Sequence, residues 1–208
     1  LYLYTRDNAE RATQGRGQRY QILNGVIRQR QAVIGLLTGS MSRGVAYQFI
    51  KLGHNLERAD MTTRIVDVNS AVQWPTHSAA AELAQERLWI GILNALSAYP
   101  MYRQQVGVHV VGAAVVRFLL TDPHFPRTVH HCLGEIENCL CDLVDYEMPM
   151  AAARHAWKRL DALRFDHLAT LHDNLDQLQA DLGALHNAIS QQYFSLHHRQ
   201  MQTQSNGT

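Results

Sequence analysis

The chain has 208 residues, of which 46% are hydrophobic, and its formal net charge is +1. We expect a single helical domain over residues 1–200, because this length supports one sizeable core, and a disordered polar tail over residues 201–208. A near-neutral charge argues against a dedicated nucleic-acid binder, which would carry a basic excess on one face. No apolar run reaches the roughly 18 residues of a membrane span, so we expect no membrane partner.

The cysteines indicate a reducing environment. Cys132, Cys139 and Cys141 fall within one expected helix, in a pattern of leucine and isoleucine. An internal disulfide framework is not expected from this spacing, and a cytoplasmic location is favoured.

The first two expected helices are separated by glycines. We expect residues 1–12 to be the tail of a helix whose start lies outside the chain, since Leu1 is not a methionine and its position suggests the middle of an element. We interpret the chain as a fragment or a processed protein, incomplete at its N-terminus. Gly15 and Gly17 end this helix. A second helix over 18–37 carries a predicted buried stripe at three- and four-residue steps, formed by Leu23, Val26, Val33 and Leu37.

Arg30 falls on the same stripe as these apolar residues. A buried guanidinium needs an acidic partner, because an unpaired buried charge costs several kcal/mol. We therefore predict that Arg30 points toward Glu57 or Asp60 of the next helix.

The third expected helix, over 43–68, is the most informative stretch of the chain. Its apolar side chains recur at the spacing that stacks them on one face, at Phe49, Leu52, Leu56, Ala59, Thr63 and Val66. Four charged residues fall within a sector of roughly 80° along the border of that face. We call them the polar seam: Glu57, Asp60, Arg64 and Asp67. Asp60 and Arg64 are spaced as a favourable i,i+4 ion pair, whereas Arg58 turns about 100° away from Glu57 and must have another partner.

Five further helical segments follow. A helix over 79–98 should end at Tyr99-Pro100, with Leu83, Ile90, Leu93 and Leu96 inward. Residues 106–120 are rich in β-branched side chains but have no second strand to pair with, so we predict a helix there. A helix begins near Val129, and Pro149 separates it from a shorter one over 150–163. The last helix has a regular three-and-four leucine pattern from Leu168 to Ile189, which predicts packing against an antiparallel neighbour, in this bundle or in a second copy of the chain.

These segments together predict an all-α fold, a bundle of about six or seven helices with long antiparallel members. The loop at residues 74–78 and the tail after residue 196 are the main non-helical parts. Homo-oligomerisation stays open, because the last helix must be covered by something.

The sequence lacks the residue patterns that metal sites, nucleophilic catalysis and phosphate binding require. Di-iron bundles use Glu-x-x-His on facing helices, whereas this chain has only the reverse order, His54-x-x-Glu57, so no metal site is expected. The cysteines lack an evident activating base, and the only lysines, Lys51 and Lys158, are not part of a phosphate loop. We therefore assign no catalytic residue and no cofactor.

The polar seam has three interpretations. It is an interhelical ion-pair network that fixes helix register, a polar pocket that receives a carboxylate, an amine or a peptide terminus, or simply a solvated surface. In the second interpretation Arg43, Arg64 and Arg127 contact anions. The candidate site residues are Arg30, Arg43, Glu57, Arg58, Asp60, Arg64, Asp67 and Arg127.

The stretch from Leu52 to Asp60, followed by Arg64 and Asp67, resembles the Glu-Arg signature of the bacterial alpha-E domain family. Residues 118–123 and 126–129 resemble that family's second block, and residues 39–43 resemble the turn before its signature helix. His54 departs from the pattern, since the family usually has arginine there. Family members tend to carry two Glu-Arg signatures, and the chain is similar to the C-terminal two-thirds of the family.

The resemblance implies an accessory role rather than a self-sufficient enzyme. Alpha-E domains are typically fused to, or encoded beside, a circularly permuted ATP-grasp ligase and often a transglutaminase-like protease. The resemblance thus implies an interaction domain for an ATP-dependent system that forms or trims amide bonds in peptides. The alternative is an enzyme of peptide or amide-bond metabolism that uses the acids of the signature helix.

Overall fold

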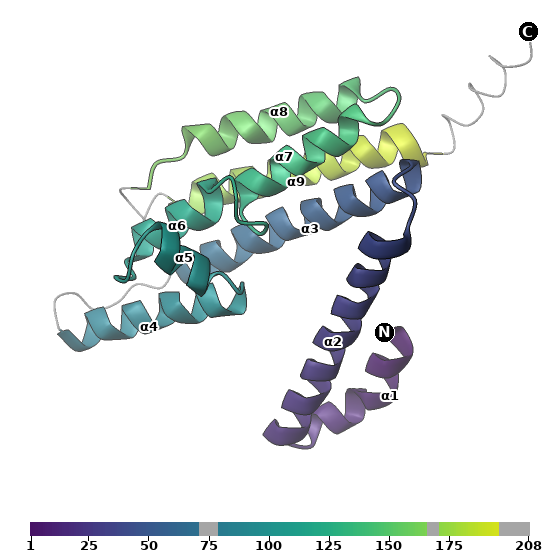
Figure 1. The fold of residues 1–208 in the computed structure, drawn as a ribbon. Helices are drawn as coiled ribbons and strands as arrows, with labels where there is room; N and C mark the ends of the chain where they lie inside the picture. Colours follow the sequence, from purple (N-terminus) through teal and green to yellow (C-terminus); the bar gives the residue numbers. More distant parts are fainter. Residues whose placement is uncertain (71–78, 166–170, 196–208) are drawn as a thin grey trace, which may run out of the picture. The chain divides into compact units, whose positions relative to one another are not determined.

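The computed structural model describes residues 1–70, 79–165 and 171–195, which divide into two compact units, Leu1–Tyr47 and the chain from Gln48 onward. The described residues form nine helices and no strand (Figure 1), which confirms the all-α class. None of these helices is both long and apolar enough to cross a bilayer. The expected loop at 74–78 and the polar tail lie outside the described residues, and the extent of the single domain stays a prediction.

The first unit is a hairpin of α1 (Tyr2–Thr13) and α2 (Arg16–Ser40). The Tyr4 ring lies directly against Gly25, where a Cβ would overlap it. The predicted buried stripe on α2 is wrong, because neither helix has a buried residue and Leu23 and Val33 are 53% and 46% exposed. Two helices alone offer each other too little surface to bury a full apolar face.

The second unit contains the rest of the helical bundle. Its helices are α3 (Val45–Ser70, which begins in the first unit), α4 (Ala79–Ala95), α5 (Tyr99–Gln105), α6 (Gly112–Thr121), α7 (Val129–Cys141), α8 (Glu147–Ala162) and α9 (Leu171–Phe194). They share one continuous apolar core, to which α3, α4, α6, α7, α8 and α9 all contribute buried side chains. The three cysteines are free thiols, as expected.

α4 ends earlier than the helix predicted over 79–98. The helix stops at Ala95, and Ser97 takes a positive φ of 55°, with Ala98 N donating to Leu93 O at 2.7 Å. This is a Schellman cap with serine at the position that usually holds glycine. Pro100 then begins α5 instead of ending a helix, because a first-turn residue needs no N–H partner.

Three further predictions are corrected by the structure. The helix predicted over 106–120 starts only at Gly112, because Gly107 adopts a φ of 140° that a helix cannot contain. Leu83, predicted to face inward, is exposed. Pro149 does not separate two helices either, since it is the third residue of α8, where its missing N–H costs no hydrogen bond.

The predicted leucine stripe of the last helix is confirmed from residue 171 on; Leu168 lies outside the described residues. Its buried members are Leu171, Leu175, Leu178, Leu182, Leu185 and Ile189. The helix packs most closely on α8 (Figure 1). It also runs antiparallel to α3, because Phe49 near the start of α3 meets Tyr193 with ring centroids 5.1 Å apart, while Asp67 near its end meets His172.

We predict that Gly112→Ala destabilises the second unit. A Cβ at Gly112 would lie 2.6 Å from Nε1 of Trp89, whose side chain is 1% exposed and cannot move aside. Overpacking of this kind costs about 1–3 kcal/mol. The measurement is urea unfolding followed by tryptophan fluorescence.

Gly91→Ala is the matched control on α4, where a Cβ meets nothing within 4 Å. It should raise the free energy of unfolding by up to about 1 kcal/mol through helix propensity. Equal effects of the two substitutions would contradict the close packing of Trp89.

Candidate functional site

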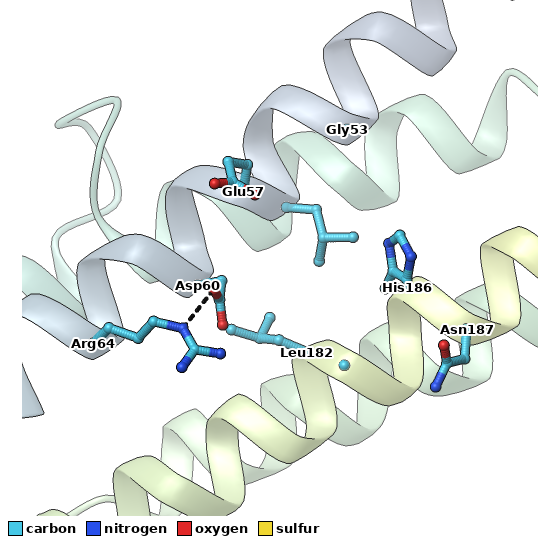
Figure 2. Close-up of a pocket in the computed structure, with 9 residues that line it drawn as sticks. Gly53, Glu57, Asp60, Arg64, Leu182, His186 and Asn187 are labelled. Carbon is cyan, nitrogen blue, oxygen red and sulfur yellow. Dashed lines mark hydrogen bonds and ion pairs between the residues drawn. The ribbon is translucent and has the colours of Figure 1, made fainter. Parts of the chain in front are cut away.

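A polar groove lies between the antiparallel helices α3 and α9. It has a volume of about 450 Å³ and is lined by Gly53, Leu56, Glu57, Asp60, Arg64, Leu182, Gly183, His186 and Asn187. Figure 2 shows charged side chains from α3 on one side of the groove and His186 and Asn187 from α9 on the other. Gly53 and Gly183 open the groove, since a Cβ at either position would meet nothing within 4 Å. The groove is therefore a real space that a side chain from either helix could fill.

Three members of the polar seam line this groove. Arg64 donates from Nε to Asp60 Oδ2 at 2.7 Å (Figure 2), which confirms the predicted i,i+4 pair. The hydrogen bond from Asp60, its charge and the charge of Glu57 together raise the pKa of Arg64, which stays a cation. Glu57 is exposed. The α3 side of the groove thus carries two carboxylates and one guanidinium, a net charge of about −1 at neutral pH.

Arg58 faces a different neighbour, as its angular position predicted. Its Nη1 donates to the Pro126 carbonyl at 3.4 Å, and one turn on, the Thr62 hydroxyl donates to the Arg127 carbonyl at 2.9 Å. The two sequence blocks of the family resemblance therefore touch each other, 68 and 65 residues apart along the chain. Arg127 lies at this contact and is not among the residues that line the groove.

The turn before α7, which Arg58 and Thr62 of α3 contact, is stabilised by hydrogen bonds to its own side chains. Asp122 Oδ1 accepts hydrogen bonds from the backbone N–H groups of His124 and Phe125, at 2.9 and 2.7 Å. Thr128, fully buried, caps α7 by accepting from His131 N at 3.2 Å. A turn fixed in this way presents its carbonyls to α3 in one orientation.

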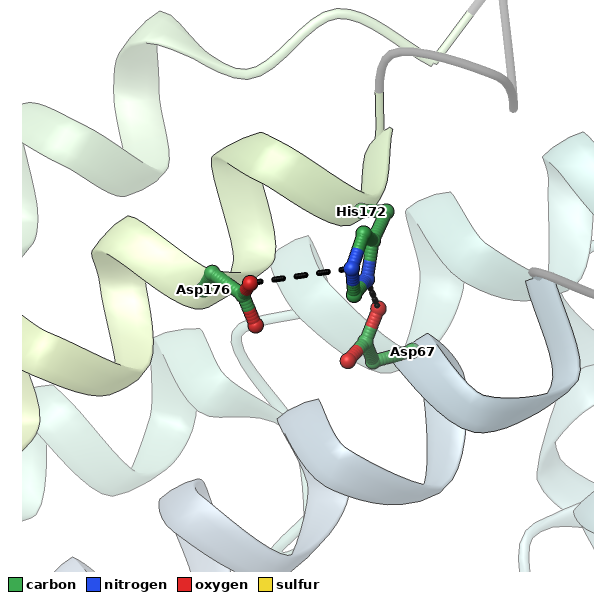
Figure 3. A group of neighbouring side chains, drawn as sticks. All are labelled: Asp67, His172 and Asp176. Atoms are coloured by element: carbon green, nitrogen blue, oxygen red, sulfur yellow. Dashed lines mark hydrogen bonds and ion pairs between the residues drawn. The ribbon is translucent and has the colours of Figure 1, made fainter.

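Asp67, the last member of the seam, pairs with α9 rather than with Arg64. Its carboxylate is 12% exposed and lies 2.7 Å from Nδ1 of His172 (Figure 3). His172 Nε2 faces Asp176, one helical turn along, at 3.7 Å. This contact joins the end of α3 to the start of α9. At Asp67 the seam therefore makes an interhelical contact of the kind that the network interpretation predicts.

The remaining candidates lie in the first unit. Arg30 is on α2, and its predicted pairing with Glu57 or Asp60 joins the two units and stays a prediction. Arg43 stacks on the Tyr47 ring at 4.2 Å from its centroid and donates to the Thr38 carbonyl. Its side chain is therefore engaged locally.

Sequence reasoning missed the contribution of α9. Its residues His172, Asp176, His186 and Asn187 complete both polar clusters along α3. The His172–Asp176 pair has the i,i+4 spacing that puts two side chains on one face, a signal the sequence does contain. His186 and Asn187 carry no such signal, because only the antiparallel register places them opposite Gly53 and Glu57.

The helices and this pocket define an all-α bundle domain with an open polar groove between two long helices. The chain belongs to the Alpha-E family: residues 1–194 match the family model, which is described as a predicted alpha-helical domain with a conserved ER motif. Glu57-Arg58 is the Glu-Arg pair on which the resemblance was based. No curated protein and no solved structure matches the chain.

We predict that the Asp67–His172 contact makes stability depend on pH. The hydrogen bond to Asp67, and then the charges of Asp67, Asp176 and Asp173, raise the pKa of His172 above its ordinary value. The stabilisation is complete below the unfolded pKa of roughly 6.5 and is lost as the pH rises through the higher folded pKa.

The measurement is urea unfolding across this pH range in EDTA, comparing the wild type with His172→Gln. Their difference in free energy of unfolding should shrink with rising pH. His124→Gln, at an exposed histidine outside this contact, is the matched control for the same substitution. A constant difference for His172→Gln would contradict the prediction.

We further predict that Thr62→Val lowers the free energy of unfolding by about 1–3 kcal/mol, because the Arg127 carbonyl loses its donor at a site where Thr62 is 1% exposed. Thr62→Ser keeps the hydroxyl and should retain this part of the stability. Thermal unfolding measures both variants, and a loss for Thr62→Ser as large as that for Thr62→Val would contradict the hydrogen bond as the source of this stability.

Proposed function

We propose that this protein is an accessory domain that acts with an ATP-grasp amide ligase, and that its α3–α9 groove holds the amino-terminal end of a peptide substrate. The observation that carries the proposal is the charge pattern of the groove. Glu57 and Asp60 offer carboxylates to an ammonium group, and Arg64 offers a guanidinium to a carbonyl or carboxylate beside it.

The lining residues favour binding over chemistry. The described residues of the groove include no serine, threonine, cysteine or lysine that would form a covalent intermediate. The buried cysteine Cys132 is not in the groove, and burial raises its pKa to about 12, far from a reactive thiolate. A groove that supplies charge and shape but no such nucleophile suits a domain that presents a substrate to another protein.

Family membership supports the choice of partner. The chain belongs to the Alpha-E family, and the resemblance implies an ATP-grasp ligase and, beside it, a transglutaminase-like protease as partners. An ATP-grasp ligase activates a carboxylate and needs an amine nucleophile in position. An acidic groove that holds an amine-bearing peptide end complements that requirement.

The first test is binding of a pentapeptide with a free amino terminus, measured by fluorescence anisotropy against the same peptide N-acetylated. We expect the free amine to bind and the acetylated peptide to bind at least about tenfold more weakly, since acetylation removes the charge that Glu57 and Asp60 attract. Glu57→Gln should weaken binding of the free peptide by a similar factor. Glu82→Gln, at an exposed glutamate on α4, is the matched control and should bind as the wild type does.

The second test asks for the partner. The chain is used as bait in its native host, and an ATP-grasp ligase should co-purify, identified by mass spectrometry. Gly183→Leu places a side chain into the groove from a position where a Cβ would meet nothing within 4 Å, so it should leave the fold and the ligase contact intact and abolish peptide binding.

Two outcomes would replace the proposal. If the isolated chain turns over a peptide or amide and Glu57→Gln abolishes that turnover, the acids of α3 act as catalysts and the enzymatic alternative holds. If no ATP-grasp ligase co-purifies and both peptides bind equally, neither the partner nor the groove assignment stands.

A further inference from the structure

We propose that His172, Asp176 and Asp67 form a binding site for a divalent transition metal ion of the zinc class, separate from the peptide groove. One donor atom of each residue lies within 4.8 Å of the other two (Figure 3). The lack of a Glu-x-x-His motif predicted no metal site, but a motif within one helix does not reveal donors brought together from two helices.

The contact with Asp67 fixes the orientation of the His172 imidazole. Nδ1 of His172 lies 2.7 Å from Asp67 Oδ1, so the N–H that bonds this carboxylate is on Nδ1. A carboxylate that accepts this N–H fixes the tautomer of a neutral histidine and leaves the lone pair on Nε2. Asp67 is well placed for this role because its side chain is only 12% exposed and it comes from the neighbouring helix.

The other ring nitrogen of His172, Nε2, faces Asp176. It lies 3.7 Å from Asp176 Oδ2, so a lone pair and a carboxylate oxygen face each other. With a neutral imidazole this arrangement is repulsive unless a cation lies between the two atoms, whereas in the metal-free protein protonation of Nε2 supplies the positive charge. A proton shared in a hydrogen bond would need about 2.7–3.2 Å between the heavy atoms, less than the observed distance. Two donors on one tetrahedral ion at about 2.0–2.1 Å lie roughly 3.4 Å apart, which is close to it.

The donor atoms decide which class of ion the site prefers. One imidazole nitrogen and the Asp176 carboxylate, with Asp67 orienting the imidazole, form a borderline donor set that suits Zn²⁺, Co²⁺ or Ni²⁺ better than Mg²⁺, which prefers oxygen alone. Among the described residues, the charges that act on His172 are those of Asp67, Asp176 and Asp173, so the local field favours a cation. The His172–Asp176 spacing of i,i+4 holds both donors on one face of α9. Water would complete the shell, since His172 and Asp176 are about half exposed.

The test is isothermal titration of Zn²⁺ into the EDTA-stripped, desalted chain at pH 7.5. We expect one ion per chain with a Kd tighter than about 100 µM. His172→Ala and Asp176→Asn should each weaken binding by at least about tenfold, and Asp67→Asn by about 10–100-fold through loss of the orienting hydrogen bond. Circular dichroism checks each fold, and Asp176→Asn serves as the safest variant because its side chain is 57% exposed.

A second histidine provides the matched control. His155 Nδ1 lies 3.0 Å from Asp181, also between two helices, but Asp181 binds Arg159 as well, whose cation repels a metal ion. His155→Ala should leave Zn²⁺ affinity and stoichiometry unchanged. Absence of binding at 1 mM Zn²⁺ in the wild type, or wild-type binding in His172→Ala, would overturn the proposal.

Discussion

The structure depends on polar contacts that α3 makes on two sides while its apolar stripe is buried in the core. On one side Arg58 and Thr62 bind carbonyls of the turn before α7, and on the other Asp67 binds His172 of α9. A long helix inside a bundle must satisfy each buried polar group along its length, because an unpaired one costs about as much as several good packing contacts. These partners therefore fix the rotation of α3 about its axis and its register against its neighbours.

This rotation separates the two residues of the Glu-Arg pair. Neighbours on a helix point about 100° apart, so Glu57 and Arg58 cannot serve the same partner. Arg58 reaches the turn at Pro126, and Glu57 is left at the open groove. The pair thus couples a residue that positions the helix to a residue that is accessible to a ligand.

The interface between α3 and α9 is closed at its ends and open in its middle. Phe49 stacks edge-on against Tyr193 and Phe194 at one end, and Asp67 pairs with His172 at the other. Between these contacts Gly53 and Gly183 remove the side chains that would fill the gap. The same two helices therefore form the groove proposed to hold a peptide end and the cluster proposed to hold a metal ion. An ion bound at His172 would strengthen one end of the interface without entering the groove.

The sequence by itself determined the all-α class, the long third helix, the buried stripes of α3 and α9, and the Asp60–Arg64 pair. Each of these follows from helical periodicity, which acts over a few neighbouring residues. Tertiary structure alone decided that Glu57 faces His186 across a groove, that Asp67 pairs with a histidine 105 residues away, and that the stripe on α2 is exposed. The spacing of residues along one helix indicates which side chains share a face, but it does not indicate which helix covers that face. The register between distant helices is set by packing over the whole unit.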